Sequence, residues 1–228
     1  MPELLLVGNS RWHWAERRGQ RLHCWHEDPP ALAPDLSDLR LWAAVGAVPE
    51  GLQLPADRQL TLQQVPLRQA PPWLGLDRAL AGWMAWQQQE GPVLVVDAGT
   101  CLSLTCIDAA GQFLGGRLSP GLALQLGSLG RGTARLPLLE GQVPAPPAAL
   151  WPQETGAAMV QGCLRAMAGA VVQAVADLPA LDAAGATWSV WLTGGDGPQL
   201  APLLPPSVPG LHQAPDLCME ALAALAFS

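Results

Sequence analysis

The sequence predicts an α/β fold with two domains around a cleft, and three similar runs of residues support this prediction. Each run is an apolar stretch with the length of a buried strand, and each leads directly into a turn of small residues. The runs are Leu4–Ser10, Leu94–Thr100 and Trp191–Asp196. In such a turn several backbone N–H groups can point at one anion, so three of them along one chain indicate a cleft for a phosphate-bearing ligand such as a nucleotide.

Strands are expected to dominate the first part of the chain. Apolar or alternating runs, separated by turn or polar residues, predict strands at Leu4–Val7, Trp12–Ala15, Leu22–Trp25 and Leu41–Val45. Further on, apolar residues at helical spacing predict a helix over Asp77–Gln89. Glu90-Gly91-Pro92 is a stop signal for this helix, and we place the end of the first domain there.

The second part of the chain opens as the first did, with a strand, a glycine turn that carries a hydroxyl group, and another strand. These segments are Val93–Val96, Ala98-Gly99-Thr100 and Leu102–Ile107. The repeat indicates a weak internal duplication. The remaining predicted elements are strands at Gln112–Leu118 and Trp188–Thr193 and helices at Glu154–Leu178 and Pro215–Phe227. The expected domains are therefore 1–91 and 92–228.

The composition excludes several classes of protein. Of the 228 residues, 50% are hydrophobic and only 14% are charged, so the chain can bury a sizeable core. The formal net charge of -7 disfavours a nucleic-acid-binding protein, which normally carries a basic stripe. All 12 positively charged residues are arginine. This excludes a P-loop, because that loop grips phosphate with a lysine.

Cysteine usage and hydropathy predict a cytoplasmic protein without a membrane span. The 5 cysteines are odd in number and form no C-x-x-C pair, so neither a disulfide framework nor a zinc site is expected. No signal peptide opens the sequence, and no uncharged apolar run approaches ~20 residues. The 4 histidines lack the spacing of metal ligands, which favours surface or turn positions for them.

Asp97 stands at the carboxyl end of a predicted buried strand, where α/β folds gather their ligands. One interpretation is structural, with the carboxylate accepting backbone N–H bonds of the turn. The other is functional, with the carboxylate ligating a cation that neutralises phosphate. The recurrence of glycine turns elsewhere in the chain favours the functional interpretation.

Asp77 and Arg78 lie where a proline-rich loop meets the first predicted helix. On sequence alone the favoured interpretation is that Asp77 is the helix N-cap, since aspartate is common there, and that Arg78 is solvated. The alternative makes Asp77 a general base and Arg78 a bidentate anchor for a carboxylate. Both interpretations stay open at this point.

In order and spacing, these motifs resemble those of type III pantothenate kinases, which belong to the actin and sugar-kinase superfamily. The resemblance spans nearly the whole chain. Its motifs are Gly8-Asn9-Ser10, Val45–Pro49, Gly75-Leu76-Asp77-Arg78, Asp97–Thr100, Gly115–Gly121, Thr133–Pro137, Glu154-Thr155-Gly156, Thr193-Gly194-Gly195 and Pro215-Asp216-Leu217.

The resemblance implies a fold of two duplicated actin-like, ribonuclease-H-like α/β domains around a nucleotide cleft. It also implies an enzyme that phosphorylates pantothenate to 4′-phosphopantothenate with ATP, the first committed step towards coenzyme A. Such an enzyme uses Mg²⁺ with ATP and requires a monovalent cation, K⁺ or NH₄⁺. The family is dimeric, with the site completed across the interface, so a homodimer is expected.

Site residues follow from the same resemblance. Asp77 is implied as the proton acceptor for the substrate hydroxyl, and Asp97 as the ligand of the monovalent cation. The residues implied to bind pantothenate are Gly75, Leu76, Asp77, Arg78 and Thr155. Those implied to bind ATP are Gly8, Asn9, Ser10, Thr100, Thr193, Gly194 and Gly195.

The chain departs from the family pattern at three places. Leu6 stands where the family usually has an aspartate that helps to place magnesium, and Cys101-Leu102-Ser103 replaces the usual alanine and threonines. The aromatic residue of the pantothenate pocket has only Trp73 as a candidate. Leu6 favours an alternative function, a catalytically weak or inactive regulatory relative that keeps the nucleotide-binding fold. A kinase for a sugar or acetate is a further alternative, and Gly75–Arg78 argues against it.

Overall fold

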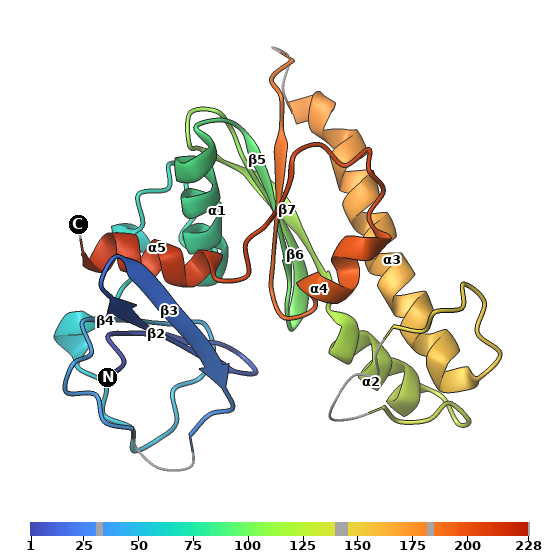
Figure 1. The fold of residues 1–228 in the computed structure, drawn as a ribbon, viewed down its shortest axis with the longest axis horizontal. Helices are drawn as coiled ribbons and strands as arrows, with labels where there is room; N and C mark the ends of the chain where they lie inside the picture. The colour runs from blue at the N-terminus through green and yellow to red at the C-terminus, as the bar shows by residue number, and fades with distance from the viewer. Residues whose placement is uncertain (31–33, 140–145, 182–184, 228) are drawn as a thin grey trace. The chain divides into compact units, whose positions relative to one another are not determined.

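The computed structural model describes residues 1–30, 34–139, 146–181 and 185–227 (Figure 1). Contacts within the chain divide it into two compact units. Unit 1 comprises Met1–Gln88, Gly111–Phe113 and the segment from Asp216 on, and unit 2 comprises Gln89–Ala110 and Leu114–Pro215. Each unit holds one sheet and at least one helix, which confirms the predicted mixed α/β class. The predicted domain division at residue 91 stays a prediction.

Unit 1 is built on a four-stranded sheet in the order β3-β2-β1-β4. β1 pairs antiparallel with β2 and parallel with β4, and β2 pairs antiparallel with β3. The strands are β1 (Leu4–Val7), β2 (Trp12–Arg18), β3 (Arg21–Glu27) and β4 (Leu41–Ala44), so the four predicted strands of this region are confirmed. The short helices η1 (Ala56–Arg58) and η2 (Leu62–Gln64) then lead to α1 (Leu76–Gln89).

Alternation along the strands of unit 1 gives the sheet two buried faces. One face carries a tryptophan-rich core made of Leu5, Val7, Trp12, Trp14, Leu39 and Trp42. On the other face, Leu4 and Leu6 are buried, and α5 (Leu217–Ala226) contacts the sheet. The last helix of the chain therefore completes the core of the unit that holds the first strand.

Unit 2 is built on a five-stranded sheet in the order β7-β6-β5-β8-β9. β5 pairs antiparallel with β6 and parallel with β8, and β8 pairs parallel with β9. The strands are β5 (Val93–Ala98), β6 (Cys101–Ile107), β7 (Phe113–Pro120), β8 (Ser189–Thr193) and β9 (Leu211–Gln213). The helical elements are α2 (Leu122–Gly132), α3 (Thr155–Asp177), η3 (Leu178–Leu181), α4 (Gly197–Leu200) and η4 (Ala201–Leu203).

α3 is the central helix of the core of unit 2. Its buried residues, among them Val160, Leu164 and Val171, pack in one cluster with Leu94 of β5 and Val190 of β8. In Figure 1, α2, α3 and α4 lie on the same side of the sheet. By length and composition alone the segment Thr155–Leu181 could cross a membrane, but half of its apolar window is buried in the protein. Such burial is typical of a helix in the core of a globular domain.

α2 and β9 are among the elements of unit 2 that the sequence does not predict. α2 contains several glycines, which have a low helix propensity, but its Leu122 and Leu126 are fully buried in the core cluster with α3. β9 has only three residues, Leu211–Gln213, too few for a recognisable alternation. Tertiary packing rather than local sequence therefore determines both elements.

We predict that Gly121→Ala lowers the melting temperature. Gly121 is the N-cap of α2, its N–H donates to the carbonyl oxygen of Thr100 at 3.0 Å, and a Cβ there would clash with the carbonyl oxygen of Gly99. Overpacking of this kind costs ~1–3 kcal/mol. Thermal unfolding followed by circular dichroism would measure the loss.

Gly132→Ala is the matched control for this prediction. Gly132 ends the same helix, and a Cβ there would meet no atom within 4 Å. Alanine is the better helix former, so this variant should be as stable as the unchanged protein or more so. If the two variants had the same melting temperature, the contact between Gly121 and Gly99 would not constrain the fold.

Candidate active site

The two turns that follow β5 and β8 lie side by side in unit 2. β5 and β8 are parallel neighbours, and Asp97 is directly opposite Thr193 in their register. The N–H of Asp196 donates to the carbonyl oxygen of Ala98 at 2.8 Å, which ties one turn to the other. Parallel strands therefore bring together two motifs that are almost a hundred residues apart in the sequence.

The half-buried Asp97 carboxylate lies between these turns. A Cβ on Gly99 would lie 3.1 Å from Asp97 Oδ1, and a Cβ on Gly194 would collide with the same oxygen. Gly194 also has a φ of 89°, a conformation that other residues rarely adopt. Gly194 is therefore required if the backbone is to pass so close to the carboxylate, and a side chain at Gly99 would be tightly packed against it.

A third glycine, Gly121, joins this cluster through its N–H bond to the Thr100 carbonyl oxygen. Because Gly121 caps α2, the amino end of an 11-residue helix begins beside the Thr100 turn. Helix N-termini favour anions. Sequence reasoning missed this feature because α2 itself was not predicted.

Thr193 and Thr155 have different surroundings. Thr193 is buried, and its hydroxyl donates to the carbonyl oxygen of Pro215 at 3.3 Å. Thr155 is exposed at the first position of α3. Its neighbour Glu154 is the N-cap and accepts bonds from the N–H groups of Gly156 and Ala157 at 2.9 and 2.7 Å. Both bonds lower the pKa of Glu154, and the bond from the N–H of Ala157 has the larger effect.

In unit 1, backbone contacts fix the turn that follows β1. The N–H of Gly8 donates to the carbonyl oxygen of Arg11 at 3.0 Å, and a Cβ on Gly46 would collide with the Gly8 carbonyl oxygen. Asn9 and Ser10 are exposed. Two backbone segments thus meet without side chains between them, and the turn presents its polar residues to solvent.

Leu6 and His13 are directly opposite each other on β1 and β2. Leu6 is only 5% exposed, so an apolar side chain occupies the position at which a carboxylate would be expected. His13 is half-buried, and its Nε2 lies 3.5 Å from where a Cβ of Gly8 would be. The expectation of a surface or turn position is therefore wrong for His13.

The surroundings of His13 favour its neutral form. Burial is the main cause that lowers the pKa of His13, and the charges of His26 and Arg11 act in the same direction. Asp216, at the start of α5, opposes them. The imidazole therefore lies against the Gly8 turn mainly as an uncharged ring at neutral pH.

The structure tests the interpretation of Asp77 as the helix N-cap. The carbonyl oxygen of Gly75 accepts the first helical bond, from the N–H of Ala79 at 3.0 Å, so the helix begins after Gly75. Asp77 lies inside the first turn of α1, where its Oδ1 accepts from the N–H of Arg78 at 2.8 Å. The N-cap interpretation of Asp77 is therefore wrong.

Arg78 is half-buried beside Asp77. Burial lowers the pKa of the Arg78 guanidinium, while the Asp77 carboxylate raises it. Its Cζ lies over the ring of Phe113, 5.8 Å from the centroid. The aromatic candidate Trp73 is 74% exposed.

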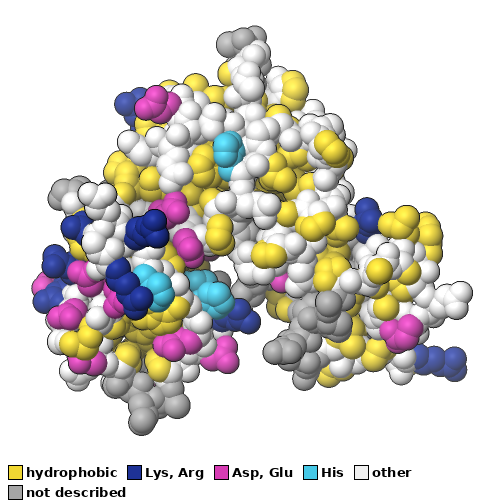
Figure 2. Space-filling view, in the orientation of Figure 1, with side chains coloured by type: hydrophobic (Ala, Val, Ile, Leu, Met, Phe, Trp, Pro, Cys, Tyr) yellow, Lys and Arg dark blue, Asp and Glu magenta, His cyan; other side chains and the backbone are white. Residues whose placement is uncertain are grey.

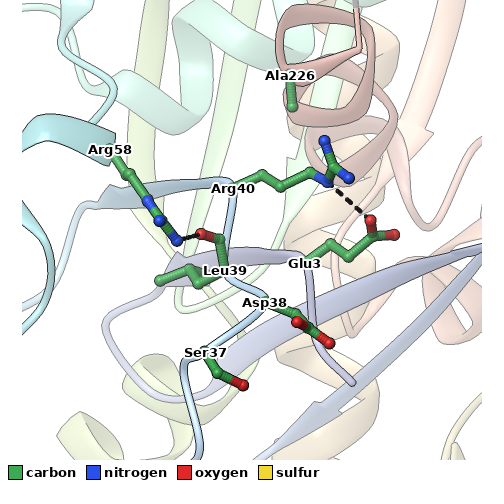
Figure 3. A pocket seen from close by; sticks show the side chains of 7 residues that line it. All are labelled: Glu3, Ser37, Asp38, Leu39, Arg40, Arg58 and Ala226. Carbon is green, nitrogen blue, oxygen red and sulfur yellow. Dashed lines mark hydrogen bonds and ion pairs between the residues drawn. The ribbon is translucent and has the colours of Figure 1, made fainter.

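A separate hollow of about 670 Å³ lies in unit 1 beside the start of β4, and Figure 3 shows its lining. Its arginines already have partners, because Arg40 pairs with Glu3 at 2.9 Å and Arg58 donates to the carbonyl oxygen of Leu39. The backbone N–H of Arg17 is the main cause that lowers the pKa of Glu3. Since its charges neutralise one another, this hollow is not a strong candidate for an anionic ligand.

Among residues 1–30, 34–139, 146–181 and 185–227, no group of three or more His, Cys, Asp and Glu side chains is placed to hold a metal ion. The 5 cysteines are free thiols in the structure. Within the described residues, Asp97 is thus not part of a group of three or more side chains that could hold a metal ion without a bound ligand.

Two solved structures share the fold of this chain. One is a conserved Campylobacter jejuni protein described as a Baf family transcriptional activator, with a TM-score of 0.57 at 19% identity, covering 97% of this chain and 96% of that one. The other is the activator of 2-hydroxyisocaproyl-CoA dehydratase from Clostridium difficile with bound ADPNP, with a TM-score of 0.54 at 10% identity, covering 97% and 91%.

Sequence comparison defines the family within this fold class. The model of type III pantothenate kinases matches residues 57–177. A type III pantothenate kinase of Synechococcus sp. (strain JA-3-3Ab) is 39% identical over 96% of this chain and 89% of the relative. That of Thermosynechococcus vestitus is 41% identical over 88% of this chain and 79% of the relative. The chain belongs to the type III pantothenate kinase family.

We predict that His13→Gln reduces the loss of stability on acidification. Because the pKa of His13 is lowered in the fold, the unfolded chain takes up this proton first as the pH falls. Stability is therefore lost from about pH 6.5 downward, until the folded-state pKa is reached. Melting temperatures at about pH 7.5 and about pH 5.5 should differ less in His13→Gln than in the unchanged protein.

His23→Gln is the control for this prediction, since His23 is an exposed histidine on the next strand. It should leave the pH dependence of the melting temperature unchanged. An equal effect of the two substitutions would contradict the role assigned to the burial of His13.

Proposed function

We propose that this protein phosphorylates pantothenate with ATP, giving 4′-phosphopantothenate and ADP, the first step towards coenzyme A. Membership of the type III pantothenate kinase family carries the proposal. The Gly75–Arg78 segment adds to it, because Asp77 and Arg78 lie next to each other at the start of α1 and neither is used as a helix cap.

The two units are two duplicated actin-like domains around a nucleotide cleft. This part of the proposal is supported by their strand orders, β3-β2-β1-β4 and β7-β6-β5-β8. In unit 1, β1 pairs antiparallel with β2 and parallel with β4. In unit 2, β5 likewise pairs antiparallel with β6 and parallel with β8. In each unit, a glycine turn follows the first strand.

ATP is bound by these turns, with Gly8, Asn9 and Ser10 in unit 1 and Thr100, Thr193, Gly194 and Gly195 in unit 2. The packing of Gly99, Gly121 and Gly194 supports this assignment, because it leaves backbone rather than side chains around Asp97. Asp97 holds the monovalent cation, K⁺ or NH₄⁺. Mg²⁺ fits a site with few protein carboxylates, since it is usually held by one or two carboxylates together with substrate phosphates. When bound with ATP, it would neutralise negative charge on the γ-phosphoryl group during transfer.

In the reaction, the Asp77 carboxylate takes the proton of the pantothenate hydroxyl as the new O–P bond forms and the bond between the γ-phosphoryl group and ADP breaks. A primary alcohol is a weak nucleophile, so a base in this position contributes ~10²–10⁴-fold to the rate. Arg78 anchors the substrate carboxylate, which its planar guanidinium can bind with two parallel bonds. Gly75 and Leu76 contact the same substrate.

The enzyme is a cytoplasmic homodimer in which α3 contributes to the interface and Thr155 to the pantothenate site. The exposed positions of α3 include the small residues Ala158, Gly162, Ala166 and Gly169. Most of the exposed large hydrophobic side chains belong to unit 2, among them Leu118, Leu150 and Trp151. Figure 2 shows charged side chains gathered around β2 and β3 and sparse around α2 and α3. A surface of small and apolar residues suits close helix packing between copies.

Asp77→Asn should abolish pantothenate-dependent ADP formation by the purified full chain with ATP, Mg²⁺ and K⁺. We expect kcat to fall by about 10²–10⁴-fold, because the amide cannot accept the proton. The fold should persist, since the Asn carbonyl can still accept the bond from the N–H of Arg78. Asp57→Asn, at an exposed position of η1, is the control and should keep full activity. Unchanged turnover in Asp77→Asn would remove Asp77 from the mechanism.

Asp97→Asn should weaken activation by potassium. A neutral amide binds a cation less well than a carboxylate, so the K⁺ concentration for half-maximal activity should rise about ten-fold or more. Initial rates over a K⁺ series, at fixed ionic strength, measure this. Asp108→Asn is a matched control, because the Asp108 carboxylate lies at the other end of the hairpin formed by β5 and β6, where it accepts from the N–H of Ala110 at 2.8 Å. An unchanged K⁺ dependence in Asp97→Asn would assign the cation to other ligands.

A further inference from the structure

Residues Gly111–Phe113 form a short segment that is built into unit 1, although the residues on both sides belong to unit 2. Two backbone bonds anchor it to Arg68. The N–H of Arg68 donates to the Gly111 carbonyl oxygen at 3.0 Å, and the N–H of Phe113 donates to the Arg68 carbonyl oxygen at 2.9 Å. The position of Phe113 relative to α1 is therefore fixed by the main chain.

Gly111 adds a packing constraint to these bonds. Its φ is 76°, and a Cβ would approach the ring of Trp86, on α1, to 3.0 Å. The glycine thus allows the segment to lie flat against the helix that also carries Arg78. Three separate contacts, two to Arg68 and one to Trp86, determine where the Phe113 ring stands.

The Phe113 ring lies beneath the half-buried guanidinium of Arg78. Burial disfavours the charged form of Arg78, as the lowered pKa of its guanidinium reflects. The face of an aromatic ring within about 6 Å attracts a guanidinium, and here Cζ is 5.8 Å from the ring centroid. The Asp77 carboxylate acts in the opposite direction to burial and raises the pKa of Arg78, and the Phe113 ring supports the guanidinium without adding a second negative charge beside it.

We propose that Phe113 is a positioning residue for Arg78, and that it gives the site its preference for a substrate that bears a carboxylate. This inference rests on the proposed function. Phe113 acts through Arg78, and it has no part in the proton transfer at Asp77. Its removal should therefore affect the binding of the substrate carboxylate and leave the chemical step intact.

The test compares Phe113→Leu, Phe113→Tyr and the unchanged full-length protein with two ligands. For pantothenate as substrate, Phe113→Leu should raise KM about two- to five-fold with kcat nearly unchanged, since a cation–π contact is worth about that much. For pantothenol, in which a hydroxymethyl group replaces the carboxylate, the inhibition constant should not change. Phe113→Tyr keeps the ring face and should restore the KM. Leu114→Ala, one residue further along β7, should change neither value.

A second comparison isolates Arg78. In an Arg78→Gln background, Phe113→Leu should produce no further rise in KM, because its effect passes through the guanidinium. Equal changes for pantothenate and pantothenol, or additive effects with Arg78→Gln, would overturn the inference and show that Phe113 only supports the fold. If Phe113→Leu does not fold, Phe113→Met takes its place. It should raise the KM for pantothenate without changing the inhibition constant of pantothenol, while Phe113→Tyr should change neither constant. If the unchanged protein does not use pantothenate, the proposed function fails and the inference fails with it.

Discussion

The parallel pairing of β5 with β8 is the constraint on which the candidate site depends. It places Asp97 opposite Thr193, so the turns after the two strands leave the sheet at one edge. Gly194 then passes so close to Asp97 Oδ1 that it has no room for a side chain, and a Cβ on Gly99 would lie only 3.1 Å from the same oxygen. Gly121 brings the start of α2 to the same place. A slip of one residue between β5 and β8 would place Asp97 opposite a different residue of β8 and separate its carboxylate from Gly194.

Much of the fold could be predicted because local patterns and tertiary structure agree in it. The four strands of unit 1 and α1 were predicted within a few residues of their bounds, since each has the period of its element and is bounded by turn residues. α2 and β9 could not be predicted, because α2 owes its stability to Leu122 and Leu126 in the core and β9 is too short to show a period. The place of α5 in unit 1 is a long-range contact that no local pattern contains.

The candidate site divides in the same way. The glycine turns and the Asp77-Arg78 pair could be found from the sequence because small residues and charges interrupt apolar runs there. The position of Asp77 inside α1, rather than at its cap, depends on which carbonyl accepts the first helical bond, and several offsets fit the sequence equally well. The contact between Phe113 and Arg78 joins segments 35 residues apart, and the half-burial of His13 depends on packing across the sheet. Neither has a signal in the neighbouring residues.

The division of the chain into units has a consequence for synthesis on the ribosome. Apart from the short segment 111–113, unit 2 is contiguous in sequence, whereas α5, which belongs to unit 1, follows unit 2 in the sequence. Until α5 has been translated, β1 lacks the helix that contacts it in the finished fold, where Leu4 and Leu6 are buried. Arg17 also has to wait for the ring of Phe227, from which its Cζ lies 4.4 Å in the finished fold. The sheet of unit 1 can therefore complete its packing only after the whole of unit 2 has been translated.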